Sequence, residues 1–120
     1  MKVIIIGGKG HVGTYLVPRL VEAGHDVINV SRGQSLPYQP HAAWARVRDV
    51  SIDRDAAEKA GDFGAQIAAL GGDVVIDMIC FTLDSAMQIV AALRGAVQHF
   101  LHCGTIWTHG PSMRVPTTEE

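Results

Sequence analysis

The amino-acid sequence predicts an α/β fold, in which helices cover both faces of a doubly wound parallel sheet of about five strands. The first observation is a series of short β-branched runs, Val3–Ile6, Val27–Val30 and Val74–Ile79, which is typical of strands buried on both faces. The second is that segments with helical periodicity separate these runs, and such alternation favours right-handed crossovers between parallel strands. We expect one domain over residues 1–120, with the strand order 3-2-1-4-5.

Two more strands complete the predicted sheet. The apolar run Phe100–Cys103 is the last strand. Residues 42–50 are assigned as a weaker strand, mainly because the alternation of strands and helices requires one there. The preceding loop, residues 32–41, contains Pro37 and Pro40 and is expected to be irregular.

Three segments are predicted to form helices. The first, residues 11–24, tolerates Pro18 because the proline lies in the second turn. The second, residues 53–70, is expected to break near Gly61–Gly64, and the third covers residues 82–95. The expected inward residues are Val12, Leu16, Leu20 and Ala23 in the first helix, and Leu83, Met87, Val90 and Leu93 in the third.

Composition and charge exclude several classes of protein. Of the 120 residues, 48% are hydrophobic and 18% are charged, which indicates a folded domain rather than a disordered chain. The net charge is −2 and the basic residues are scattered, so we expect no nucleic acid partner. The apolar stretch Val3–Ile6 is too short for a signal peptide or a membrane span, which favours a cytoplasmic protein. Cys80 and Cys103 match no zinc-site spacing and are expected to be free, buried thiols.

The segment IIIGGKGHVG, residues 4–13, joins the first strand to the first helix through a glycine-rich loop. Gly8, Gly10 and Gly13 form G-x-G-x-x-G, whereas Gly7, Gly10 and Gly13 form G-x-x-G-x-x-G. Glycines in such loops permit a tight turn, close approach of backbone N–H groups to a pyrophosphate, and close helix packing. The helix begins near His11 and would direct its positive end at the phosphates. The loop predicts a dinucleotide site; a structural turn is the alternative, and the Gly-Lys-Ser/Thr of a P-loop is absent.

The end of the second strand bears on the choice of cofactor. NAD sites usually carry an acidic residue about 20 positions after the loop. Here the strand ends with Ser31 and Arg32, and Asp26 lies at its opposite end. A hydroxyl and a guanidinium suit a 2′-phosphate, which arginine holds through charge-assisted hydrogen bonds. We therefore expect NADP in preference to NAD, with a solvated loop arginine as the alternative.

The first 33 residues resemble the start of extended short-chain dehydrogenases/reductases, the NAD-dependent epimerase/dehydratase group. That group typically has T-G-G-x-G-x-I-G here; Gly7, Gly10 and Gly13 take its glycine positions and Val12 its apolar position. VSRG, residues 30–33, is closest to atypical members, including reductase-like and RNA-associated homologues. The resemblance implies a Rossmann-like fold that binds NADP or NAD. It favours the Gly7 register, with Gly8 as a passenger, and a cofactor contact set that includes Gly7, Gly10, His11, Val12 and Gly13.

The resemblance extends to the ends of later strands. Asp49 and Val50 lie at the end of the third strand, where the family's aspartate contacts adenine and its neighbour packs on the ring. A loop or helix-capping aspartate is an equally good interpretation of Asp49. The segment GDVVIDMIC matches the family's fourth strand, and Ile79, Cys80 and Phe81 replace the small residues that pass beneath the cofactor there.

The last 22 residues are similar to the family segment that carries a catalytic hydroxyl. Gly104 and Thr105 take the positions of its paired serines, and Gly110 matches the glycine of its Y-G pair. The resemblance implies that Thr105 is the catalytic residue that hydrogen-bonds the reacting oxygen. A threonine that merely ends a strand is the alternative.

Three histidines lie near this segment, and we expect no metal among them. They are His99, His102 and His109. His109 is a candidate substrate contact, and Trp107 is a candidate pocket wall with core packing as the equal alternative.

The family's catalytic Tyr-x-x-x-Lys pair does not occur in the 120 residues. Neither Tyr15 nor Tyr38 has a lysine four positions later, so no general acid for a carbonyl oxygen is evident. We expect the chain to be the cofactor-binding part of a longer enzyme, truncated relative to the family, without the substrate-binding part and inactive by itself.

The resemblance implies hydride transfer with a nucleotide sugar or a similar alcohol or carbonyl compound, elaborated into epimerisation, dehydration or reduction. The alternatives are a non-catalytic dinucleotide sensor, a nucleic-acid-associated homologue of the same family, and a simple flavin or nucleotide-binding module. Family members commonly dimerise through the fourth helix. We therefore expect a homodimer or other self-association through Leu83, Met87, Val90 and the open sheet edge.

Overall fold

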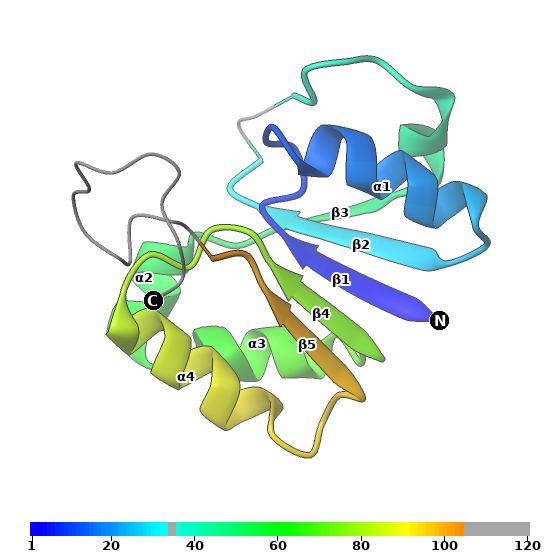
Figure 1. Ribbon diagram of the computed structural model, residues 1–120. Coiled ribbons are helices and arrows are strands. Elements are labelled where there is room, and N and C mark those ends of the chain that lie inside the picture. Colours follow the sequence, from blue (N-terminus) through cyan, green and yellow to red (C-terminus); the bar gives the residue numbers. More distant parts are fainter. Residues whose placement is uncertain (34–35, 105–120) are drawn as a thin grey trace, which may run out of the picture.

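The computed structural model describes residues 1–33 and 36–104, and in this part of the chain five parallel strands form one sheet (Figure 1). The strands are β1 (Lys2–Ile6), β2 (Asp26–Ser31), β3 (Arg48–Ser51), β4 (Val74–Asp77) and β5 (His99–His102). The helices of the same residues are α1 (Gly13–Glu22), the 3-10 helix η1 (Ala42–Arg46), α2 (Arg54–Ala60), α3 (Phe63–Ala69) and α4 (Leu83–Leu93). The spatial order is β3-β2-β1-β4-β5, so the predicted α/β fold and strand order are confirmed.

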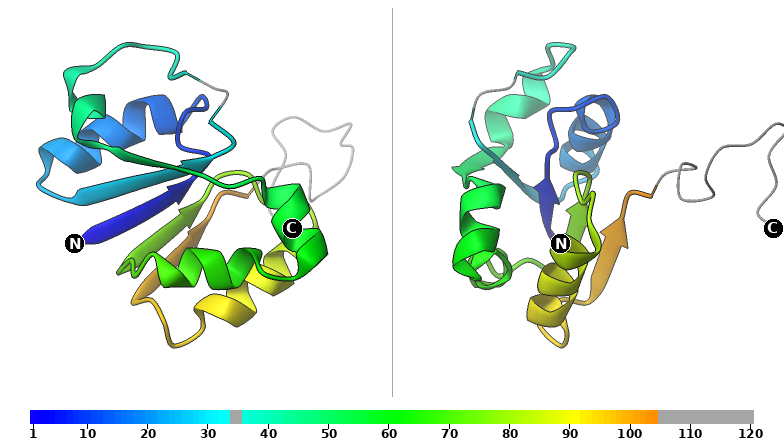
Figure 2. Two further views of the ribbon diagram at one scale, coloured as in Figure 1. Left: turned by 180° about the vertical axis from the view of Figure 1, so that it is seen from behind. Right: turned by 90° about the vertical axis from the view of Figure 1, so that its left-hand side faces the viewer.

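The helices form two layers, one on each face of the sheet (Figure 2). Successive side chains of a strand point to opposite faces, so a strand covered on both sides is apolar throughout. One core lies under α1 and η1 and contains Val3, Ile5, Val17, Val21, Val27, Ala43 and Ile76. The other lies under α2, α3 and α4 and contains Ile4, Ile6, Ile28, Val30, Ala57, Phe63, Ile67, Val75, Ile89 and Leu93.

Residues 42–50 are only partly a strand, contrary to the prediction. The first half forms η1, and pairing with β2 begins at Arg48, opposite Ile28. His41 caps η1, since its Nδ1 accepts a 3.0 Å hydrogen bond from the Ala43 N–H. Ala43 is buried in the core under α1. This cap and this burial fix a helical turn where alternation alone predicted an extended chain.

Helix α1 faces the sheet through a different stripe from the predicted one. Thr14, Val17 and Val21 are buried, Leu16 and Leu20 are partly buried, and Val12 and Ala23 are exposed. The reason is Gly13, where an added Cβ would lie 2.1 Å from the carbonyl oxygen of Gly8. This close approach turns Gly13 towards the sheet, and with it Val17 and Val21, which follow at helical spacing.

The predicted break in the second helical segment is confirmed. Gly61 ends α2 in the left-handed conformation, with a φ of 78°, and α3 begins at Phe63. Glycine adopts this conformation without the steric cost of a Cβ, so the two short helices can pack separately beneath the sheet.

Helix α4 also turns a different face to the core. Ser85, Ile89 and Leu93 are buried, whereas Leu83, Met87 and Val90 are 76%, 62% and 42% exposed. Only Leu93 of the predicted inward set lies in the core. The contact with α3 sets this rotation, because an added Cβ on Gly64 would lie 2.4 Å from the Cβ of Ala92.

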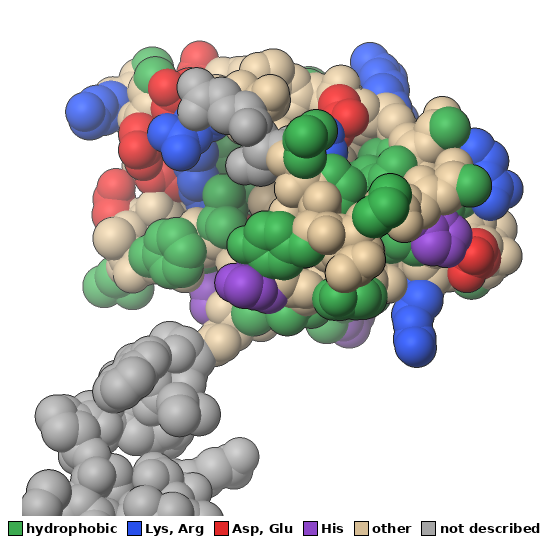
Figure 3. Space-filling model, turned by 90° about the horizontal axis from the view of Figure 1, so that it is seen from above, with side chains coloured by type: hydrophobic (Ala, Val, Ile, Leu, Met, Phe, Trp, Pro, Cys, Tyr) green, Lys and Arg blue, Asp and Glu red, His purple; other side chains and the backbone are tan. Residues whose placement is uncertain are grey.

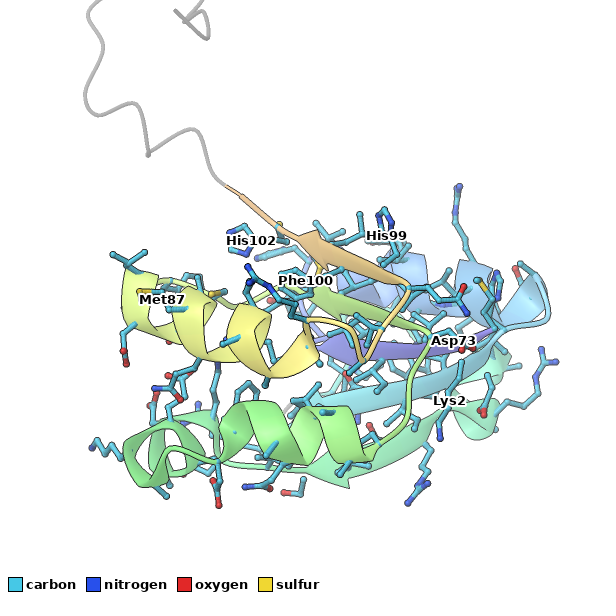
Figure 4. The ribbon with its side chains drawn as sticks, turned by 90° about the horizontal axis from the view of Figure 1, so that it is seen from below. Lys2, Asp73, Met87, His99, Phe100 and His102 are labelled. Atoms are coloured by element: carbon cyan, nitrogen blue, oxygen red, sulfur yellow. The ribbon has the colours of Figure 1, made fainter. Side chains whose placement is uncertain are left out.

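Strand β5 is the edge of the described sheet and is largely uncovered (Figure 4). Phe100 is partly buried against the core, but His99, Leu101 and His102 are exposed. The residues that the structure describes contain no group of three or more metal-ligating side chains, and none of their helices is long and apolar enough to span a membrane. Cys80 and Cys103 are free as predicted, but half-buried and exposed respectively, because they follow the ends of short strands.

A buried ion-pair network joins α2, β4 and α4. Both terminal nitrogens of Arg54 donate to the fully buried Asp77 carboxylate, at 2.8 and 2.9 Å. Arg54 Nε donates to Glu58 Oε1 at 2.6 Å, and Ser85 Oγ donates to Glu58 Oε2 at 2.7 Å. The network thereby fixes α2 and the start of α4 against the carboxyl end of β4.

The network lowers the pKa of Glu58. Burial opposes ionisation of this carboxyl, but the hydrogen bonds from Arg54 and Ser85 and the charge of Arg54 outweigh it, so the pKa lies below its ordinary value of 4.5. The same kinds of contact, with Asp77 and Glu58, raise the pKa of Arg54 despite its burial.

We predict that Glu58 makes the fold less stable in acid. Its pKa is lower in the folded chain than in the unfolded chain, so its contribution is present above pH 4.5 and is lost as the pH falls through the folded pKa. Glu58→Gln should flatten the loss of unfolding free energy between about pH 5 and pH 3, measured by urea unfolding. Asp55→Asn, an exposed change on the same helix, is the control, and an unaltered acid slope in Glu58→Gln would contradict the assignment.

Candidate functional site

A cavity of about 590 Å³ lies at the carboxyl ends of β1, β2 and β4. It adjoins the point where the strand order reverses, with β2 on one side of β1 and β4 on the other. Open α/β sheets bind ligands at this place. The lining residues are Ile6, Gly7, Lys9, Gly10, Val30, Ser31, Arg32, Leu36, Tyr38, Ile52, Asp53, Arg54, Asp55, Phe63, Ile79 and Phe81.

The glycine loop forms one wall of this cavity. Gly7 turns out of β1 with a φ of 79°, and an added Cβ there would lie 2.8 Å from Ile79 Cγ2. Gly10, by contrast, faces open space, since the nearest neighbour of an added Cβ is the Gly7 carbonyl oxygen at 3.8 Å. Gly7 therefore makes the tight turn, and Gly10 leaves room for a ligand beside the start of α1.

Gly8 is not the passenger that the resemblance implied. An added Cβ on Gly8 would lie 2.6 Å from Asn29 Oδ1, and the Gly8 N–H donates to that oxygen at 2.8 Å. Gly8 also lies against Gly13, as described above. Both glycine registers therefore have a structural reason: Gly7 makes the turn, and Gly8 allows close packing against Asn29 and Gly13.

A closed set of hydrogen bonds lies behind the loop, and we call its members Gly8, Lys9, Asn29 and Asp49 the Asn29 clamp. Asn29 Oδ1 accepts from the Gly8 N–H, and Asn29 Nδ2 donates to Asp49 Oδ1 at 2.9 Å. Asp49 Oδ2 accepts from Lys9 Nζ at 3.1 Å. The clamp connects two consecutive loop residues to β2 and β3.

The ends of β2 and of the following loop form the polar side of the cavity. Ser31 and Arg32 both line it, and Arg32 is exposed. Tyr38 lines it too, with its ring edge-on to His11 at 4.6 Å between centroids. The face of the molecule seen from above carries hydrophobic side chains near its middle and charged side chains near its rim (Figure 3).

The opposite side of the cavity is built on the ion-pair network. The Arg54 guanidinium carbon lies 4.7 Å from the centre of the Phe63 ring, and both residues line the cavity. Arg54 also donates to the Ile79 carbonyl at 3.3 Å. Burial, followed by the charge of Asp77, raises the pKa of the neighbouring Cys80 thiol, which therefore stays protonated at neutral pH.

The structure brings part of the predicted cofactor set together. The residues that line the cavity are Gly7, Gly10, Ser31, Arg32, Ile79 and Phe81. His11, Val12 and Gly13 lie at the junction of the loop and α1, outside the lining. The predicted catalytic residue, Thr105, lies outside the described residues, as do Trp107 and His109.

Asp49, Val50 and Cys80, which are also predicted as cofactor contacts, do not line the cavity. The reason for the first two is that β3 continues to Ser51, which leaves them inside the strand rather than at its end. Asp49 is held in the Asn29 clamp, and Val50 packs against the core. Ile52 and Asp53, which follow β3, reach the cavity in their place.

Sequence reasoning missed several residues that shape this site. They are Lys9, Asn29, Ile52, Asp53, Arg54, Phe63 and Asp77. A signal existed for two of them, since Asn29 and Asp77 interrupt or end apolar strand runs, and a buried polar side chain requires a partner. The spacing of Arg54 and Glu58, four residues apart on a helix, also indicated an ion pair.

Comparison with known proteins identifies the family. The model of the NAD dependent epimerase/dehydratase family matches residues 3–120. The 2′-dehydrokanamycin reductase of Streptomyces kanamyceticus is 30% identical over 119 residues, which are 99% of this chain and 32% of the reductase.

Solved structures show the same fold. A UDP-galactose 4-epimerase has a TM-score of 0.73 and 21% identity, with 100% of this chain and 43% of that chain covered. The UDP-glucose 4-epimerase from Bifidobacterium longum, in complex with NAD+ and UDP, has a TM-score of 0.71 and 19% identity, with 100% and 42% covered. The chain therefore spans about a third of the reductase, at 32%, and about two-fifths of each epimerase, at 43% and 42%. Since the family model covers nearly the whole sequence, and the sheet order and glycine loop agree with it, the chain belongs to the NAD dependent epimerase/dehydratase family.

Proposed function

We propose that this chain is the NAD(P)-binding part of an epimerase, dehydratase or reductase. The observation that carries the proposal is the cavity at the carboxyl ends of the strands, walled by the glycine loop next to the start of α1. Its volume of about 590 Å³ is within the range of small-molecule sites, roughly 300–1,000 Å³. The names of the relatives support the proposal, because one is a reductase and another is an epimerase with NAD+ bound.

The residues present fit a dinucleotide. Gly7 and Gly10 allow the loop backbone to approach a pyrophosphate beside the start of α1. Ile79 and Phe81 offer apolar contact on the far side. When bound, the nicotinamide would supply hydride transfer; the chain's own residues would bind, orient and shield it.

Family membership supports the substrate class that we propose. A nucleotide sugar or a similar alcohol or carbonyl compound is proposed, with Thr105 as the hydrogen-bond donor to the reacting oxygen. The 120 residues contain no Tyr-x-x-x-Lys, so we expect residues 1–120 alone to bind the dinucleotide without turnover.

Dinucleotide binding is the primary test. Titration of the intact protein with NADPH and NADH, followed by nicotinamide fluorescence, should show saturable binding. Binding of neither would reject the proposal. Binding without turnover of any alcohol or carbonyl substrate in the intact protein would instead support a dinucleotide sensor.

Arg32 tests the preference for NADP over NAD. Its guanidinium at the cavity, beside Ser31, suits a 2′-phosphate. Arg32→Ala should lower the affinity for NADPH about tenfold or more and the affinity for NADH by less than about threefold. The loss for NADPH corresponds to roughly 1.5–3 kcal/mol of charged hydrogen bonding. Arg48→Ala, an exposed change at the far end of β3, is the matched control. Equal losses for both dinucleotides would contradict the preference.

Self-association is a second expectation. Leu83, Met87 and Val90 form an exposed apolar stripe on α4, and β5 leaves an open edge in the described sheet. Light scattering of residues 1–120 should give a mass above the monomer, and Met87→Glu should lower it. A monodisperse monomer would contradict this expectation.

A further inference from the structure

We propose that Asn29 is a positioning residue, which holds the glycine loop and, through Asp49, the Lys9 ammonium in place for the phosphate groups of a bound dinucleotide. The inference rests on the proposed function and adds a role for a residue that contacts no ligand itself.

Asn29 is unusual for its position. It lies in the middle of β2, between Ile28 and Val30, and its exposed fraction is 0%. Alternation along the strand places it on the α1 side of the sheet, with Val27. A buried amide costs free energy unless its donor and acceptor are both paired, so an apolar side chain would be the simpler occupant.

The partners of Asn29 explain why an amide is required. Its oxygen accepts from the Gly8 N–H at 2.8 Å, and its nitrogen donates to Asp49 at 2.9 Å. A valine would leave the buried Gly8 N–H without this partner, and an aspartate would place a second carboxylate beside Asp49. Only a side chain with both a donor and an acceptor joins the loop to β3.

Lys9 gives the clamp a function beyond stability. Its side chain lies against Asp49 and is only 14% exposed, and its ammonium is 5.9 Å from the centre of the Trp44 ring. Lys9 also lines the cavity. A free lysine loses rotamer entropy when a ligand immobilises it, whereas the clamp holds Lys9 before the ligand arrives.

The chemistry selects phosphate groups as the target. Lys9 and Gly10 both line the cavity, and a lysine ammonium next to a glycine loop at the start of a helix favours an anion. The adenosine portion carries no charge of its own. Loss of the clamp should therefore weaken ligands with phosphates and spare adenosine.

Three single variants of the intact protein test this positioning role: Asn29→Val, Asp49→Asn and Lys9→Met. Dissociation constants for NADH, NADPH and adenosine are measured by calorimetry. We expect each variant to weaken both dinucleotides about tenfold, and adenosine by less than twofold. The double variant Asn29→Val/Lys9→Met should bind the dinucleotides less tightly than Asn29→Val alone, but by much less than a further tenfold. The reason is that both changes remove the same clamp.

Ile28→Val is the matched control, since it shortens a buried side chain of the same strand on the opposite face. It should lower stability and leave the ratio of adenosine to NADH affinity unchanged. If Asn29→Val does not fold, the dissociation constants of Asp49→Asn and Lys9→Met still test the positioning role. Unchanged NADH affinity, or equal losses for NADH and adenosine, would overturn the positioning role. Binding of no dinucleotide by the unaltered protein would reject the proposed function itself, and the positioning role with it.

Discussion

The contact of Gly13 with the backbone of Gly8 is the constraint on which the carboxyl edge of the sheet depends. No Cβ fits between them, since one on Gly13 would lie 2.1 Å from the Gly8 carbonyl oxygen. The contact lets α1 start directly behind β1, and it decides that Val17 and Val21 face the sheet. It also directs the positive end of α1 towards the loop that walls the cavity. The apolar core on this face and the position of the candidate site therefore both depend on the contact between Gly13 and Gly8.

Two polar networks flank the cavity, one on each face of the sheet, and each is built on a buried polar side chain, Asn29 or Asp77. The Asn29 clamp lies on the α1 face, and the Arg54–Asp77 pair lies on the face of α2, α3 and α4. A buried ion pair adds little net stability compared with an apolar pair, but removal of one partner costs about 3–5 kcal/mol. These networks therefore specify how the loops sit at the strand ends more than they stabilise the fold. Their position beside the candidate site is consistent with that role.

Part of the candidate site could be predicted from the sequence. The glycine spacing and the strand ends predict Gly7, Gly10, Ser31 and Arg32 as site residues, and these four line the cavity. The sequence predicts that Asp49 lies at the end of β3, as an adenine contact or as a loop or capping aspartate, but pairing with β2 extends the strand to Ser51. The sequence does not indicate Arg54 and Phe63 as site residues, because they belong to helices far from the glycine loop in the sequence. Only the packing of these helices brings them to the cavity.

The sequence by itself determined the class of fold, the strand order and the glycine loop. β-branched runs that alternate with helical segments admit few other arrangements, and chain chirality fixes the crossovers. Only the tertiary structure decided the rotation of α1 and α4, the turn η1, and the partners of Asn29 and Asp77. The physical reason is that helical periodicity marks a face without fixing its angle. That angle follows from two close contacts, Gly13 with Gly8 and Gly64 with Ala92. Neither contact can be read from the periodicity of the helix itself.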